Sequence, residues 1–124
     1  MPLERQLMRW KLRGQIDQSI IDIVLQLQTR LAQHWQLPIH TPPADTFLLH
    51  VANSLARIGR GGCVSPLYSV FWEELQGAQE FPGVLQIHQD LLAIIAREIP
   101  KAEQTYYLAA LHSLVLSAKQ TSFD

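Results

Sequence analysis

The 124-residue sequence contains little cysteine, has almost no net charge and has no long apolar run. Its one cysteine, Cys63, cannot form a disulfide within the chain and lacks the neighbouring thiols that a structural zinc site requires. A formal net charge of -1 gives no general attraction to nucleic acid or to anionic lipid. The chain also lacks an uncharged apolar stretch of about 18 residues, the minimum for a membrane span. These absences predict a cytoplasmic protein with no metal or cofactor, no membrane segment and no direct nucleic-acid partner.

What the sequence does have is regular spacing of its apolar residues. They recur at steps of three or four, the period of an amphipathic helix, with proline near predicted helix starts and glycine near predicted ends. No segment alternates apolar and polar residues long enough to favour a strand. The predicted helices span about 16–35, 42–58, 66–76, 82–99 and 101–119. The sequence therefore predicts an all-α protein, a five-helix bundle around one core.

The predicted domain organisation has three parts. A helical domain covers residues 16–118, an N-terminal basic helical arm covers 1–15, and a C-terminal tail covers 119–124. The arm has four basic residues and one acidic residue, and it lacks the continuous apolar stretch of a secretory signal. Short charge clusters of this kind are usually solvated. We therefore expect the arm to extend the first helix or to project as a separate piece.

Histidines are the main candidates for chemistry, because imidazole can act as a base, a ligand or a phosphoryl acceptor near neutral pH. On the predicted second helix, Arg57 lies two turns after His50, roughly 10 Å along the axis. Its guanidinium could pair with the oxygens of a phosphoryl group. His112 lies among apolar residues of the last helix, which is typical of a core group or of a buried contact with another chain.

The remaining polar groups form no recognisable site. His34, His40 and His88 lack the spacing of metal ligands, so structural or surface roles are expected for them. Glu73 and Glu74 are adjacent on a predicted helix and point apart. The sequence has neither a glycine-rich phosphate loop nor a GxSxG motif. It therefore predicts a protein that is not an enzyme.

The chain resembles the PRD module, the phosphotransferase-system regulation domain of bacterial antiterminators and sugar-operon activators. The resemblance covers about residues 16 to 118, in the order and spacing of four stretches: FLLHVANSLARI, SPLYSVFWEEL, EFPGVLQIHQDLLAIIAREI and EQTYYLAALHSLV. Its most specific pieces are His50 followed by Arg57, the Ser-Pro-Leu at 65–67, and the Leu-His pair that ends in His112. With no room for an attached nucleic-acid-binding domain, the chain resembles a stand-alone PRD.

The resemblance implies a five-helix bundle that forms a homodimer, with His50 and His112 near the interface as phospho-acceptors. Their phosphoryl donor would be a phosphocarrier protein or a sugar-permease component of the phosphotransferase system, and Arg57 would stabilise the phosphoryl group. The module would act by dimerisation, or by binding a PRD-containing regulator, in transcriptional control of carbohydrate genes. Phosphohistidine carries nearly two negative charges, which can attract an arginine or repel an identical group across a two-fold interface.

Two other interpretations remain open. The stretch KLRGQIDQSIIDIVLQLQTRLA resembles the first helix of helical chorismate mutases, with Arg13, Asp17 and Arg30. Those enzymes stabilise a dianionic transition state with several cations, and downstream this chain offers only His50 and Arg57 for such a role. The other interpretation is a helical interaction protein that has lost phosphorylation.

Overall fold

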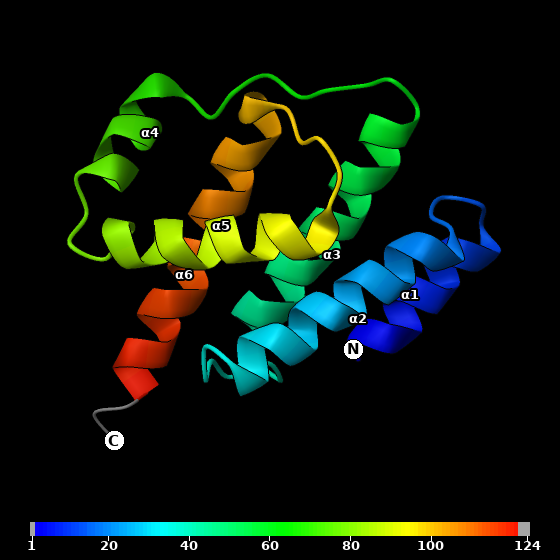
Figure 1. The fold of residues 1–124 in the computed structure, drawn as a ribbon, viewed down its shortest axis with the longest axis horizontal. Helices are drawn as coiled ribbons and strands as arrows, with labels where there is room; N and C mark the ends of the chain where they lie inside the picture. Colours follow the sequence, from blue (N-terminus) through cyan, green and yellow to red (C-terminus); the bar gives the residue numbers. More distant parts are fainter. Residues whose placement is uncertain (1, 122–124) are drawn as a thin grey trace.

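The computed structural model describes residues 2–121, which form six α-helices and no strand (Figure 1). The helices are α1 (Leu3–Leu12), α2 (Gln18–Gln33), α3 (Pro42–Gly59), α4 (Ser69–Gln76), α5 (Phe81–Ile95) and α6 (Lys101–Thr121). The all-α class is confirmed, whereas the predicted number of five helices is wrong. The additional helix is α1, and α2 to α6 follow the order of the five predicted helices.

The core lies where α3 and α6 pack together, with α2 and α5 against them. The predicted apolar stripe of α2 is buried from Ile20 to Leu31, and Leu48, Val51 and Leu55 bury the matching stripe of α3. Helix α2 begins at an Asp17 cap, whose carboxylate accepts the Ile20 N–H at 3.0 Å. None of the helices in the described range is both long and apolar enough to cross a membrane.

Helix α1 is packed against the bundle and does not continue α2. Leu3 and Leu7 are buried against α2 and α3. A turn between α1 and α2 includes Gly14, whose φ of 73° lies in the left-handed region that favours glycine. The expectation of a solvated arm therefore holds for only one side of α1, because the other side is part of the core.

Two helix boundaries differ from the sequence prediction. Residues 65–68 are not helical, because the chain before α4 bonds to α6: the Leu67 N–H donates to Thr105 Oγ1 at 3.0 Å. Helix α5 ends at Ile95 and not at Ile99, because Ala96 takes a left-handed conformation with φ 55°. Tertiary contacts and a local backbone turn thus set these ends.

Helix α4 is the most peripheral of the six. It contributes one buried residue, Leu75, and its further attachment is an edge-to-face contact between Trp72 and Phe81, with ring centroids 6.0 Å apart. The long connection from α3 places α4 at the end of the molecule opposite the turn between α1 and α2 (Figure 1). The C-cap of α4 is Gly77, as the sequence predicts.

Candidate functional site

A buried carboxylate joins α3 to α6. Glu103 on α6 is fully buried, and its oxygens accept hydrogen bonds from Arg57 Nε at 2.8 Å, Arg57 Nη2 at 2.7 Å, Ser54 Oγ at 2.9 Å and the Val64 N–H at 3.1 Å. The hydroxyl of Tyr107 donates to Ser54 Oγ at 2.7 Å. The hydrogen bonds from Arg57 hold the pKa of Glu103 below its usual value despite the burial. Arg57, expected to face a phosphoryl group, is thus already paired.

His50 lies one turn before Ser54 on α3, and its ring faces α6. Its ring centroid is 5.9 Å from that of Tyr106 and 6.0 Å from that of Tyr107. Burial lowers the pKa of His50, and the positive charge of Arg57 lowers it further. The ring is therefore neutral near pH 7, with a lone pair on one nitrogen. Its Nε2 atom is buried and has no hydrogen-bond partner among the described residues.

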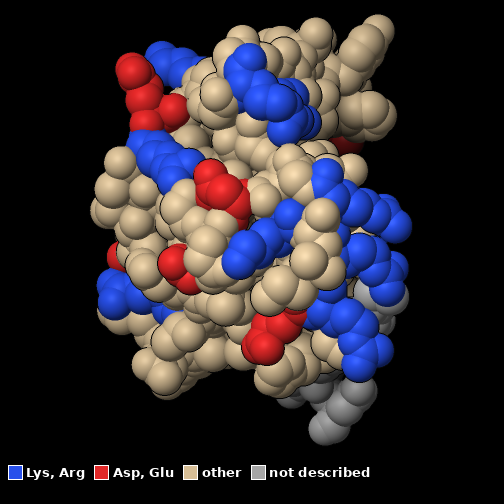
Figure 2. Space-filling model, turned by 90° about the vertical axis from the view of Figure 1, so that its right-hand side faces the viewer, with Lys and Arg blue, Asp and Glu red and all other residues tan. Residues whose placement is uncertain are grey.

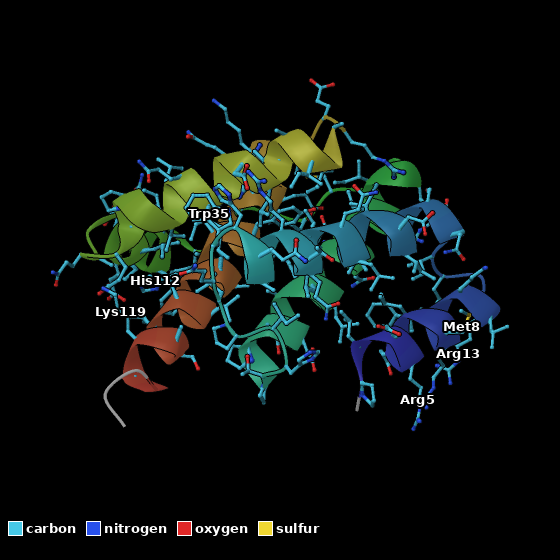
Figure 3. The ribbon with its side chains drawn as sticks, turned by 60° about the horizontal axis from the view of Figure 1, so that its bottom comes forward. Arg5, Met8, Arg13, Trp35, His112 and Lys119 are labelled. Carbon is cyan, nitrogen blue, oxygen red and sulfur yellow. The ribbon has the colours of Figure 1, made fainter. Side chains whose placement is uncertain are left out.

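His112 lies farther along α6, beside the start of α5. Its Nε2 atom is 3.6 Å from Glu80 Oε1, and Lys119 Nζ is 3.4 Å from Glu80 Oε2. Figure 3 shows His112 and Lys119 at the end of the molecule away from Arg5 and Arg13. The His112 ring also lines a cavity of about 510 Å³ with Phe71 and other residues of α4. The structure thus places His112 where α4, α5 and α6 meet.

The two histidines have separate surroundings but share one property. Across residues 2–121, the buried side-chain nitrogens and oxygens without a hydrogen-bond partner are the Nε2 atoms of His50 and His112. Such an atom destabilises a fold by about 1–3 kcal/mol, because it has lost water and gained no partner. Neither nitrogen forms a hydrogen bond: that of His50 has no polar partner in the described range, and that of His112 has only the 3.6 Å contact with Glu80.

The other three histidines differ. His88 is buried on α5, and its Nε2 pairs with Gln104 Oε1 at 2.9 Å, which is a structural role. His34 and His40 are exposed. Within the described range, no three His, Cys, Asp or Glu side chains are grouped so that they could hold a metal ion.

Two ion pairs were not visible in the sequence. Asp90 accepts hydrogen bonds from Arg30 Nε at 2.8 Å and Nη2 at 2.9 Å, and from Trp35 Nε1 at 2.8 Å. Arg57 and Glu103 form the other pair and lie 46 positions apart in the chain. No fixed spacing could have revealed contacts between such distant positions. Arg30 and Arg57, two of the three arginines that the mutase interpretation named, are each bound to a different carboxylate.

No protein-family model matches the chain, and no solved structure matches it. Two relatives do. The chain is 59% identical over 120 residues to an uncharacterized protein of Haemophilus influenzae, an alignment that covers 97% of this chain and 96% of that protein. It is 31% identical over 107 residues to the uncharacterized protein YhfY of Escherichia coli, covering 86% of this chain and 89% of YhfY. The chain belongs to the protein family that contains these two proteins.

Proposed function

We propose that the chain is a stand-alone PRD-type regulatory protein, in which α2 to α6 are the five helices of the module. A phosphocarrier protein or a sugar-permease component of the phosphotransferase system would phosphorylate His50 and His112 in the cytoplasm. The modified protein would then act by dimerisation, or by binding a PRD-containing regulator of carbohydrate genes. The observation that carries this proposal is that the buried Nε2 atoms of His50 and His112 form no hydrogen bond, because these are the two histidines that the PRD resemblance implies as phospho-acceptors.

The chemistry needs a nitrogen with a free lone pair. In the tautomer with the proton on Nδ1, the neutral His50 ring has its lone pair on Nε2, and the lowered pKa keeps the ring neutral at pH 7. That lone pair attacks the phosphorus of a phosphohistidine on the donor. The new N–P bond forms as the donor's N–P bond breaks. The donor imidazole leaves with the bonding electrons and takes up a proton, and the His50 ring releases its Nδ1 proton.

Access to these nitrogens requires local opening, because both Nε2 atoms are buried. The neighbouring helix of His112 is α4, whose Phe71 and Leu75 line the cavity of about 510 Å³ that His112 also lines. Helix α4 is short and buries one residue, so it needs little free energy to move compared with α3 or α6. Opening of α4 would expose His112 to the donor.

The added charge would change the surroundings of His112. Glu80 lies 3.6 Å from its Nε2, and a phosphoryl group brings nearly two further negative charges to that place. Repulsion between the phosphoryl group and Glu80 would disfavour the closed arrangement of α4 and α5. Phosphorylation of His112 would thus act as a structural switch.

At His50 the effect of Arg57 would be indirect. Its guanidinium is held by two hydrogen bonds to Glu103, so direct contact with a phosphoryl group would leave a buried carboxylate without its main donor. Arg57 would therefore act through its charge from its present position, and the negative charge of Glu103 would offset part of that effect. We expect His50 to gain less stabilisation from Arg57 than the sequence spacing suggested.

Phosphoryl uptake is the direct test. The protein is incubated with a reconstituted phosphocarrier relay, and its intact mass is measured at neutral pH, where phosphohistidine survives. We expect the wild type to gain phosphoryl groups and His50→Ala and His112→Ala each to lose one. His34→Ala, at an exposed histidine, should match the wild type. Absence of uptake by the wild type, or unchanged uptake when both His50 and His112 are replaced, would contradict the proposal.

A further inference from the structure

The strongly exposed large apolar side chains are confined to two places in the described part of the chain. They lie on α1 and on α4 with the residue before it: Met8, Leu12, Tyr68, Val70 and Phe71. Leu12 is 82% exposed and Tyr68 is 72% exposed, so neither contributes to the core. Clustered apolar groups on a surface mark contact sites, whereas isolated ones are ordinary. Two such clusters on one small molecule therefore need an explanation.

The cluster on α1 is basic. Arg5, Met8, Arg9 and Leu12 follow one another at the steps of three, four and seven that share a helix face, opposite the buried Leu3 and Leu7. We call these four residues the α1 face. Figure 3 shows Arg5, Met8 and Arg13 directed away from the rest of the protein. Figure 2, which views this end of the molecule, shows Lys and Arg gathered on it.

The cluster on α4 is acidic. Tyr68, Val70, Phe71, Glu73 and Glu74, which we call the α4 face, are all exposed. The rings of Tyr68 and Phe71 contact each other, with centroids 6.2 Å apart. From 61 to 96 the sequence has no lysine or arginine, so no cation of this segment neutralises the two glutamates.

We propose that the α1 face of one copy of this chain docks on the α4 face of a second copy. Each face combines apolar groups with charge of one sign, and the two signs are opposite. Neither Arg5 nor Arg9 forms an ion pair within residues 2–121, so both remain available to the glutamates of another copy. Arginine and methionine are enriched at protein interfaces, which fits a protein surface better than a phosphate backbone.

The geometry determines the kind of assembly. Helix α4 and the turn that ends α1 lie at opposite ends of the molecule (Figure 1). Because the two faces lie at opposite ends, we expect their contact to be heterologous and to join copies head to tail into chains or rings. This contact needs no phosphorylation, so it can be tested independently of the proposed function.

Sedimentation of the purified protein at low salt tests the contact. We expect the weight-average mass to rise with protein concentration and to fall as salt is raised from about 50 mM to about 500 mM, because salt screens the paired charges. A mass that is independent of concentration at low salt would overturn the proposal.

Charge-reversal variants identify the faces. Arg5→Glu/Arg9→Glu and Glu73→Lys/Glu74→Lys should each weaken association about tenfold, because attraction becomes repulsion. The variant with all four substitutions has the wild-type net charge, and its α1 and α4 faces again carry charges of opposite sign. It should therefore associate like the wild type. Asp22→Lys/Glu98→Lys, which reverses two exposed acids elsewhere, should retain association. Loss of association in this control, or no recovery in the fourfold variant, would overturn the proposed contact.

A mixing experiment separates a contact between unlike faces from a contact between like faces. Arg5→Glu/Arg9→Glu retains a native α4 face, and Glu73→Lys/Glu74→Lys retains a native α1 face. At a concentration where the wild type associates, each variant alone should have a lower average mass, whereas an equal mixture should form a complex containing both variants. Circular dichroism confirms that each variant is folded. A mixture that behaves like its separate components would show that the two faces do not bind each other.

Discussion

At the scale of single residues, the Arg57–Glu103 pair joins the two central helices. Glu103 is fully buried, and Arg57 supplies two of the four hydrogen bonds that its carboxylate accepts. A buried ion pair adds little stability relative to an apolar pair, but the removal of one partner is costly because the other charge stays buried. Removal of either partner should therefore destabilise the packing of α3 against α6.

Arg57→Ala should lower the free energy of unfolding by about 3 kcal/mol, because Glu103 would remain buried without its main donor. Urea denaturation followed by circular dichroism measures the change. Arg60→Ala is the matched control, since the Arg60 side chain is exposed and donates only a 3.5 Å bond to the Gln15 carbonyl. Its effect should stay within about 0.5 kcal/mol. Equal effects of the two substitutions would mean that the buried pair is unimportant.

The unpartnered nitrogen of His50 predicts an unusual result for a core position. His50→Phe should leave stability unchanged or raise it by about 1 kcal/mol, because it removes an unpaired buried polar atom and keeps a ring beside Tyr106. His88→Phe makes the same chemical change but should lower stability by about 1–3 kcal/mol, because it leaves Gln104 Oε1 unpaired. Urea midpoints of the two variants provide the comparison. Equal destabilisation would show that His50 is a structural group.

At the scale of helices, α4 differs from the others in how little it buries. A helix of 8 residues with one buried residue, Leu75, is weakly stable by itself. By contrast, α6 has Tyr107, Leu108, Leu111 and Leu114 in the core. Local opening free energies follow such differences in burial. Movement of α4 is thus the least costly rearrangement that would uncover His112.

Hydrogen exchange followed by mass spectrometry should detect this difference. We expect amides of residues 70–76 to exchange much faster than those of 105–115, because α4 opens without unfolding of the bundle. Leu75→Ala should speed exchange in α4 further while leaving α6 protected, because Leu75 is the buried residue that holds α4. Exchange of α4 and α6 at one common rate would contradict independent opening.

The sequence correctly predicted the helices that have a continuous apolar stripe. The prediction was wrong or incomplete where contacts between distant residues determine a helix boundary or a side-chain partner. The stripes of α2 and α3 were predicted correctly because a 3.6-residue period is a local property. The start of α4 was misplaced because Ser65-Pro66 is a good local start signal, whereas in the structure the Leu67 N–H bonds to Thr105 and residues 65–68 are not helical. Arg57 was recognised, but its partner Glu103 was not, because helix packing brings them together.

At the scale of the whole molecule, charge is distributed unevenly although the sum is close to zero. The formal net charge is -1, yet residues 2–13 contain four basic side chains and one acid, whereas residues 61–96 contain no lysine or arginine. The three basic residues Arg30, Arg57 and Lys119 pair with acids on other elements. Pairing inside the bundle therefore leaves the exposed charge of α1 and α4 to act at a distance on other molecules.

Stability of the whole molecule should decrease as the pH falls from 7 to 5.5. Burial lowers the pKa of His50 and His88 below 6.5, so in this range the unfolded chain binds protons that the folded protein does not. The stability that these two neutral histidines contribute is therefore fully present above pH 6.5. It is lost as the pH falls toward their pKa values in the folded protein. The arginine partners of Glu103 and Asp90 lower the pKa values of these two carboxyl groups. The stability that the two groups contribute is therefore lost only at more acidic pH.

Urea midpoints at several pH values between 8 and 5.5 measure this dependence, and His50→Phe/His88→Phe isolates its source. The double variant has no imidazole at either buried position, so its stability should vary less with pH than that of the wild type, whatever its absolute value. His34→Phe/His40→Phe removes two exposed imidazoles and should retain the wild-type slope. A wild-type stability that is constant or rises on acidification would contradict neutral buried histidines. It would also remove the reason for expecting a nucleophilic ring nitrogen at His50, because protonation removes the lone pair that must attack phosphorus.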